Sequence, residues 1–136
     1  MAKDLYHDLV KEILVKDGWT ITDDPYYVKW NPEWQIDLGA EKIIGATKEN
    51  EQIAVEIKSF LKASFSNEFH SILGQYLNYL SALKRTDPSR KLYLAVPEFV
   101  WNTKFQIEGI KVSIEDYDVK IFVYNIQTKK IKRWII

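Results

Sequence analysis

The chain has 136 residues, 46% of them hydrophobic and 14% aromatic, which suffices for one compact domain with its own core and excludes two ordinary domains. Its 19 basic and 19 acidic side chains cancel, which argues against a protein that only coats nucleic acid through charge. Cysteine is absent, which excludes disulfides and thiolate metal sites; with no signal peptide or membrane span recognisable, we expect one domain, residues 1–136, in the cytoplasm.

Apolar residues at helical spacing predict a first helix over residues 4–16, which ends before Gly18. Short apolar and aromatic runs then predict strands over residues 19–22, 26–30, 34–38, 42–47 and 53–60, with a polar turn at 48–51. A long amphipathic helix is expected over residues 67–85, with Ser66 as its N-cap and the Asp87-Pro88 pair as its stop.

The last third of the chain predicts a buried strand, two short helices and a closing hairpin. The strand spans residues 91–96, the helices 98–104 and 107–116, and the hairpin pairs residues 119–126 with 130–136. Helix, several strands, long helix and strand, in this order, indicate a mixed α/β domain around one sheet.

Charged residues interrupt the apolar strand expected at residues 53–60. Because side chains alternate across a strand, Glu56 and Lys58 share one face with Ala54. A carboxylate and an ammonium in such a strand are costly to desolvate unless they have a partner or a function. Asp37, at the end of an earlier strand, supplies a second carboxylate.

Two carboxylates and a lysine are the set that a magnesium-dependent phosphodiester hydrolase needs. Asp37 and Glu56 are the expected Mg²⁺ ligands, because this ion prefers carboxylate oxygens and completes its shell with water and phosphate oxygens. Lys58 would orient the attacking water and stabilise negative charge, and Glu12 could hold an outer-shell water or a second ion. Gln75 and Tyr79 stand four residues apart on one face of the long helix and would donate neutral hydrogen bonds.

These residues resemble a known family. Asp37, the EIK sequence at residues 56–58 and the Gln75/Tyr79 pair resemble the PD-(D/E)XK restriction-endonuclease-like superfamily, including its QxxxY feature. The sequences DLYHD (residues 4–8), VEIKSF (55–60) and GQYLNY (74–79) more closely resemble the XisH family of cyanobacteria, over essentially the whole chain. Members of that family are named as controlling factors for excision of the fdxN DNA element.

The resemblance implies a restriction-endonuclease-like αβββαβ core, with a mixed central sheet flanked by helices. It places Glu12, Asp37, Glu56, Lys58, Gln75 and Tyr79 at the superfamily's site positions, whereas Ile36 stands where the superfamily's name expects proline. It also implies DNA and a site-specific recombinase as associates and an XisI-type protein as partner. A homodimer would suit symmetric DNA sites.

Each of these features also has a purely structural explanation. Glu56 with Lys58 alone is typical of a solvated cross-strand ion pair, and Glu12 of a glutamate bordering a buried stripe. The two histidines lack ligand spacing, which favours structural or surface roles. Tryptophans in strands are mainly packing residues, except in the turn-like segment 30–34, and the basic run at 129–133 fits a solvated strand face.

Three functions therefore stay open. The first is a DNA-directed accessory factor that controls excision or site-specific recombination, with a magnesium site at Asp37 and Glu56. The second is an active magnesium-dependent endonuclease. The third is a catalytically silent interaction module that works with an XisI-type partner, which the zero net charge keeps open.

Overall fold

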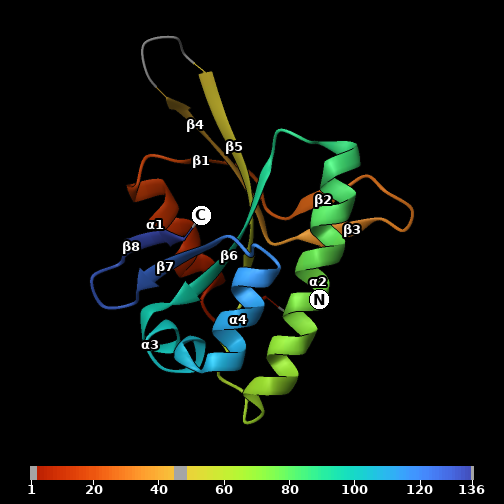
Figure 1. Cartoon of the computed structure of the whole chain (residues 1–136). Coiled ribbons are helices and arrows are strands. Elements are labelled where there is room, and N and C mark those ends of the chain that lie inside the picture. Colours follow the sequence, from red (N-terminus) through yellow and green to blue (C-terminus); the bar gives the residue numbers. More distant parts are fainter. Residues whose placement is uncertain (1–2, 45–48, 136) are drawn as a thin grey trace.

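The computed structural model describes residues 3–44 and 49–135 and is built around a six-stranded sheet in the order β1-β4-β5-β6-β7-β8 (Figure 1). The strands are β1 (Thr20–Asp23), β4 (Leu38–Ile44), β5 (Glu49–Ile57), β6 (Lys91–Pro97), β7 (Ile121–Asn125) and β8 (Lys130–Ile135). The pairs β5–β6 and β6–β7 are parallel, and the other pairs are antiparallel. Outside this sheet, β2 (Tyr26–Val28) and β3 (Trp34–Ile36) form their own hairpin.

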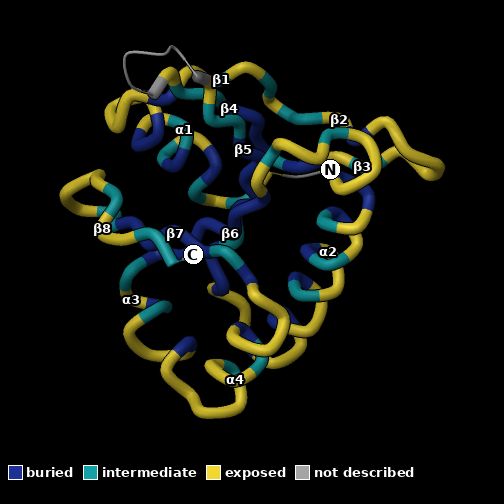
Figure 2. The backbone as a smooth tube through the Cα atoms, turned by 45° about the horizontal axis from the view of Figure 1, so that its top comes forward, coloured by how far each residue is buried: buried dark blue, intermediate teal, exposed yellow. Residues whose placement is uncertain are grey.

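Helices cover both faces of the sheet. The first helix, α1 (His7–Lys16), lies on one face; α2 (Phe65–Thr86), α3 (Glu98–Trp101), the 3₁₀ turn η1 (Lys104–Gln106) and α4 (Glu108–Asp116) lie on the other (Figures 1 and 2). The expected mixed α/β domain with a central sheet flanked by helices is confirmed. From α1 to β6, the elements of the main sheet follow the expected order of helix, three strands, helix and strand.

The core consists of two layers, because the central strands bury both faces. Along β5, Ile53 and Val55 pack on the α1 side, whereas Ala54 packs on the α2 side. Along β6, Leu92 faces α2 and Tyr93 faces α1. Figure 2 shows this buried centre in dark blue, with the exposed turns around it. Near-continuous apolar runs are typical of strands covered on both faces.

Several boundaries differ from the sequence prediction. The long helix begins at Phe65, and its N-cap is Ser64, whose hydroxyl accepts a hydrogen bond from the Asn67 amide; Ser66 was therefore the wrong cap. The strand expected to continue to residue 60 ends at Ile57, so Lys58 follows the strand instead of belonging to it. The strand expected at 42–47 runs over Leu38–Ile44, and residues 45–48 lie outside the described part of the chain.

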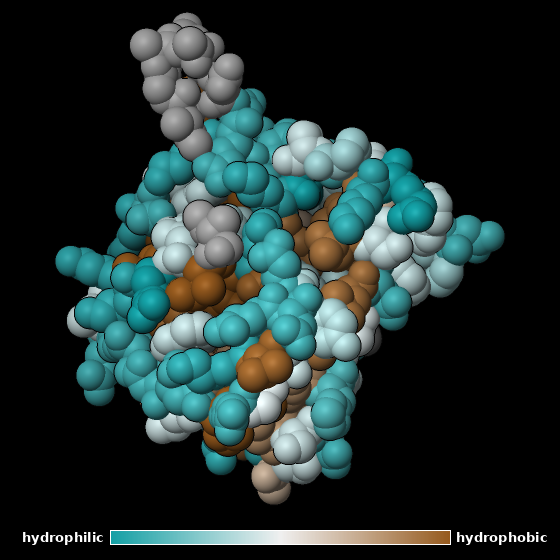
Figure 3. All heavy atoms as spheres, viewed as in Figure 1, coloured by the Kyte–Doolittle hydropathy of each residue, from teal (hydrophilic) through white to brown (hydrophobic). Residues whose placement is uncertain are grey.

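The face of the molecule drawn in Figure 3 is mostly hydrophilic. In the view of Figure 3, hydrophilic side chains cover most of the molecule, and separate apolar patches interrupt them. Within the described residues, no helix is long and apolar enough to cross a membrane.

Candidate functional site

The backbone brings Asp37 and Glu56 face to face. Leu38, the first residue of β4, pairs with Val55 of β5, so the antiparallel register places Asp37 opposite Glu56. The Asp37 carboxylate accepts a 2.7 Å hydrogen bond from the Ile57 amide. The Asp37 amide donates a longer, 3.4 Å bond to the Glu56 carboxylate. Each acid is thus fixed by the backbone that carries the other.

Glu56 is 7% exposed, and its burial has a clear electrostatic effect. Burial, followed by the negative charge of Asp37, raises the pKa of Glu56 to about 9. Burial and the two nearby carboxylates also raise the pKa of Tyr79 to about 12. Without a cation, one proton therefore stays on Glu56 at neutral pH, because two adjacent carboxylates in a poorly solvated place disfavour a second negative charge.

A cavity of about 410 Å³ opens on this acid pair. Lys58 and Gln75 line it together with Asp37 and Glu56, so four of the six expected site residues meet there. The positive charge of Lys58 lowers the pKa of Glu56 to a lesser extent than burial and Asp37 raise it. One cavity therefore gives access to both carboxylates, which could bind a cation, and to the lysine, which could contact an anionic group bound to that cation.

A second cavity, of about 180 Å³, adjoins the first. It shares Asp37, Glu56 and Gln75 with the larger cavity and adds Tyr79 and His7. Tyr79 also packs against Trp34 of β3, with ring centroids 5.9 Å apart, which fixes its ring beside the acids. Five of the expected site residues therefore line these two neighbouring cavities.

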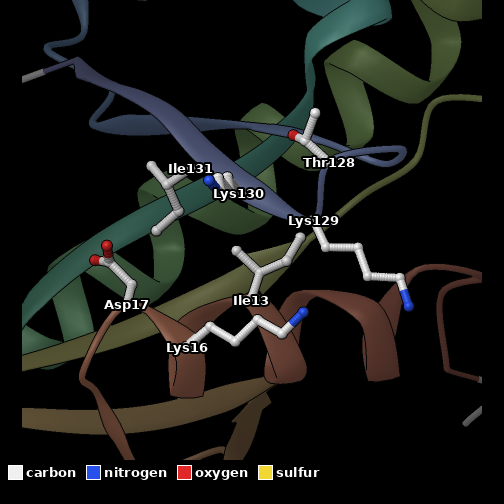
Figure 4. Close-up of a pocket in the computed structure, with 7 residues that line it drawn as sticks. All are labelled: Ile13, Lys16, Asp17, Thr128, Lys129, Lys130 and Ile131. Carbon is white, nitrogen blue, oxygen red and sulfur yellow. The ribbon is translucent and has the colours of Figure 1, made fainter.

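Glu12 does not join them. It lies on the outer side of α1, 46% exposed, with its carboxylate 3.6 Å from the Lys16 amine and 3.7 Å from the Lys129 amine. Lys16 and Lys129 line a different groove, between α1 and the β7–β8 turn, shown in Figure 4. In that view their amino groups point away from the Asp17 carboxylate. The placement matches the alternative of a glutamate bordering the buried stripe of α1.

Lys58 has a partner that the sequence did not suggest. Its amine lies 3.6 Å from the carboxylate of Glu68, in the first turn of α2. Glu68 is itself largely buried and also accepts a 2.9 Å hydrogen bond from the Lys62 amide. In the sequence, Glu68 could be explained as an acid near the start of the long helix, where the helix dipole favours a negative charge. Nothing in the sequence indicated that it also contacts Lys58.

Two more contacts frame the site and were also missed. The Asp4 carboxylate accepts hydrogen bonds from the amide and the hydroxyl of Ser59, at 2.9 and 3.0 Å, which ties the segment before α1 to the residue after Lys58. The buried His7 ring contacts Asp24 at 2.8 Å, so the structural role expected for this histidine fits its placement. Both partners are distant in sequence, and no local pattern predicts them.

The donor set at the acid pair fits a magnesium ion that keeps much of its water. Two carboxylates meet beside an open cavity, and Mg²⁺ commonly binds one or two carboxylates while retaining several waters. Over residues 3–44 and 49–135, no group of three or more His, Asp or Glu side chains is arranged as a complete metal cage. Water molecules and a substrate phosphate would complete the shell of an ion held there.

Comparisons with known proteins agree with one another. The family model described as XisH protein matches residues 1–132. Two crystal structures are similar: an XisH family protein from Nostoc punctiforme PCC 73102 and an fdxN element excision controlling factor protein from Anabaena variabilis. Each shares 41% sequence identity, with a TM-score of 0.88, over 98% of this chain and 100% of that chain. Among curated proteins, none matches the chain.

Proposed function

Because the chain belongs to the XisH family, we propose that it is a DNA-directed accessory factor that controls excision of a DNA element, with a magnesium site at Asp37 and Glu56. The name of the Anabaena variabilis protein, an excision controlling factor, supports the excision role. The order of elements from α1 to β6 supports a relationship to the PD-(D/E)XK superfamily.

The observation that carries the proposal is the facing pair of carboxylates beside an open cavity. Placing two acids opposite each other, one of them 7% exposed, is unfavourable unless something offsets their charge. A divalent cation would do so, and DNA phosphates would reach it through the cavity of about 410 Å³. When bound, the ion would polarise a phosphate oxygen and make a bound water more acidic.

Calorimetric titration with Mg²⁺ and Mn²⁺ tests the site. We expect saturable binding by the native chain that disappears in Asp37→Asn and in Glu56→Gln, two substitutions that preserve side-chain shape. Glu12→Gln is the matched control, because the ion pairs described for Glu12 are with Lys16 and Lys129, outside the cavity, and it should bind as the native chain does. Equal binding by all four proteins would show that the acid pair is not the site.

Strand cleavage is a second candidate, supported by the position of Lys58 beside the same acids. In that role its ammonium group would orient a water and stabilise negative charge on the phosphate. Duplex, branched and supercoiled DNA, each incubated with Mg²⁺ or Mn²⁺, should then be cut by the native chain but not by Lys58→Ala. Cutting that survives Lys58→Ala would come from a contaminant or another site.

The partner is part of the same proposal. An XisI-type protein, a site-specific recombinase and a second copy of the chain are the expected associates, and analytical ultracentrifugation of the chain alone and with an XisI-type protein would test two of these three. A tight protein complex combined with no DNA affinity at low salt would favour the interaction-module alternative.

A further inference from the structure

The acid pair lies at the junction of two cavities, not at the end of one. The cavities of about 410 and 180 Å³ share Lys3, Asp37, Glu56 and Gln75. A phosphate held at the acids would therefore have space on both of its sides. One side leads toward Lys58 and the start of α2, and the other toward Tyr79 and the β1–β2 turn.

The dimensions of this double cavity favour a single strand. Spaces of a few hundred Å³ are of the size that holds a small ligand, so the cavity of about 410 Å³ has room for one nucleotide at the acids. An intact duplex would have to keep its bases outside, whereas an unpaired strand can place its phosphate at the acids and a base on each side.

The rim of the larger cavity provides the chemistry that an unpaired nucleotide needs. Leu5 and Leu61 line it and are 73% and 50% exposed, which places two large apolar side chains beside a cluster of charges. Lys3 and Lys62 line the same cavity. Apolar side chains such as leucine insert between base steps and unstack them at nucleic-acid interfaces, and lysines contact phosphates.

From these observations we infer that the double cavity is a groove for an unpaired nucleic-acid strand, so that the protein prefers flaps, branches or bubbles to intact duplex. Leu5 and Leu61 contact the exposed base faces, and Lys3 and Lys62 contact the flanking phosphates. This inference rests on the proposed function, and it adds which form of DNA the site accepts.

Competition binding in the presence of Mg²⁺ tests it, with a fluorescent flap oligonucleotide displaced by unlabelled flap, single strand or intact duplex of the same sequence. We expect flap and single strand to compete about tenfold better than duplex, because the two leucines are buried against bases only when those bases are unpaired. The Leu5→Ser/Leu61→Ser double variant should lose this preference while keeping its weaker duplex binding. Both side chains are exposed, so its unfolding transition should stay that of the native chain.

The control is Val15→Ser/Val112→Ser, which removes two similarly exposed apolar side chains on α1 and α4 that line neither cavity. It should keep the native preference. Equal competition by flap and duplex, or equal losses in the two double variants, would overturn the groove while leaving the DNA role intact. If the protein binds neither the labelled flap nor any of the unlabelled DNA forms, both the groove and the proposed function are wrong. Loss of binding to a protein partner in Leu5→Ser/Leu61→Ser, with DNA binding unchanged, would identify the rim as a protein-docking surface instead.

Discussion

Glu56 links the site to the stability of the whole domain. Its pKa is 4.5 in an exposed peptide and about 9 in the folded chain, so between these values the folded state holds a proton that the unfolded state has lost. The contribution of Glu56 to folding stability therefore falls as pH rises through this window, by about 1.4 kcal/mol for each pH unit.

Glu56→Gln should remove this dependence, because glutamine does not titrate. We expect the variant to match the native chain near pH 4 and to be more stable than it at pH 8, as measured by urea unfolding. Glu12→Gln, which changes an exposed glutamate, should retain the native slope. Parallel curves for Glu56→Gln and the native chain would mean that Glu56 is ionised in the fold.

The same proton predicts how magnesium binding depends on pH. A cation at the acid pair must displace the proton of Glu56, so affinity should rise as pH increases toward about 9. Calorimetry at pH 7 in buffers of different ionisation enthalpy should report the release of up to one proton per ion. A pH-independent affinity without proton release would place the ion elsewhere.

Asp4 tests whether the contact with Ser59 supports the segment that carries Lys58. Asp4→Ala removes the acceptor of the Ser59 amide and hydroxyl, and also that of the Tyr6 amide, and should lower the free energy of unfolding by about 2 kcal/mol. Asp8→Ala is the matched control, because Asp8 is 86% exposed and makes only a 3.7 Å ion pair with Lys3 among its described contacts. Equal effects in urea unfolding would show that the Asp4 contact contributes no more than a surface ion pair.

At the scale of elements, Gly39, two residues after Asp37, allows β1 and β4 to approach each other closely. A Cβ atom at this position would lie 2.8 Å from the Asp23 carboxylate and 3.0 Å from the Tyr26 ring. Gly39→Ala should therefore destabilise the fold by about 1–3 kcal/mol. Gly74→Ala provides the opposite case, because no atom lies within 4 Å of the added methyl group and alanine favours the helix by about 1 kcal/mol. Thermal unfolding should shift down in the first variant and up in the second.

The sequence predicts an element well when the pattern that indicates it is repeated within that element, and poorly when it depends on contacts with distant residues. The apolar stripe of α2 and the alternation of β5 are repeated many times within one element, so both were predicted correctly in kind. The N-cap of α2 was misplaced because Ser64 and Ser66 offer the same capping chemistry two residues apart. The pairing of β2 with β3 outside the main sheet depends on tertiary packing and has no signature in either strand.

At the scale of the molecule, the sequence could predict which candidate residues come together where they are close in sequence or joined by strand pairing, but not where their contacts depend on packing between distant segments. Glu56 and Lys58 are close in sequence, and register carries Asp37 to them. Glu12 was misplaced because a glutamate at the border of a helical stripe can face either the sheet or the solvent, and only the contact with Lys129 decides between them. Glu68 and Asp4 act across long separations, so their roles became visible only with the fold.

The zero net charge of the chain sets a limit on how DNA binding can respond to salt. Without a general positive field, attraction must come from a few local cations, and Lys3, Lys58 and Lys62 line the cavity with the acids. Three phosphate contacts on a single strand predict a slope of log affinity against log salt of about −2. Lys62→Ala should reduce its magnitude by about 0.7. Lys132→Ala, on the exposed edge of β8, should leave it unchanged. If the slope is steep and only Lys132→Ala reduces it, DNA binds at the edge of β8 and not at the acid pair.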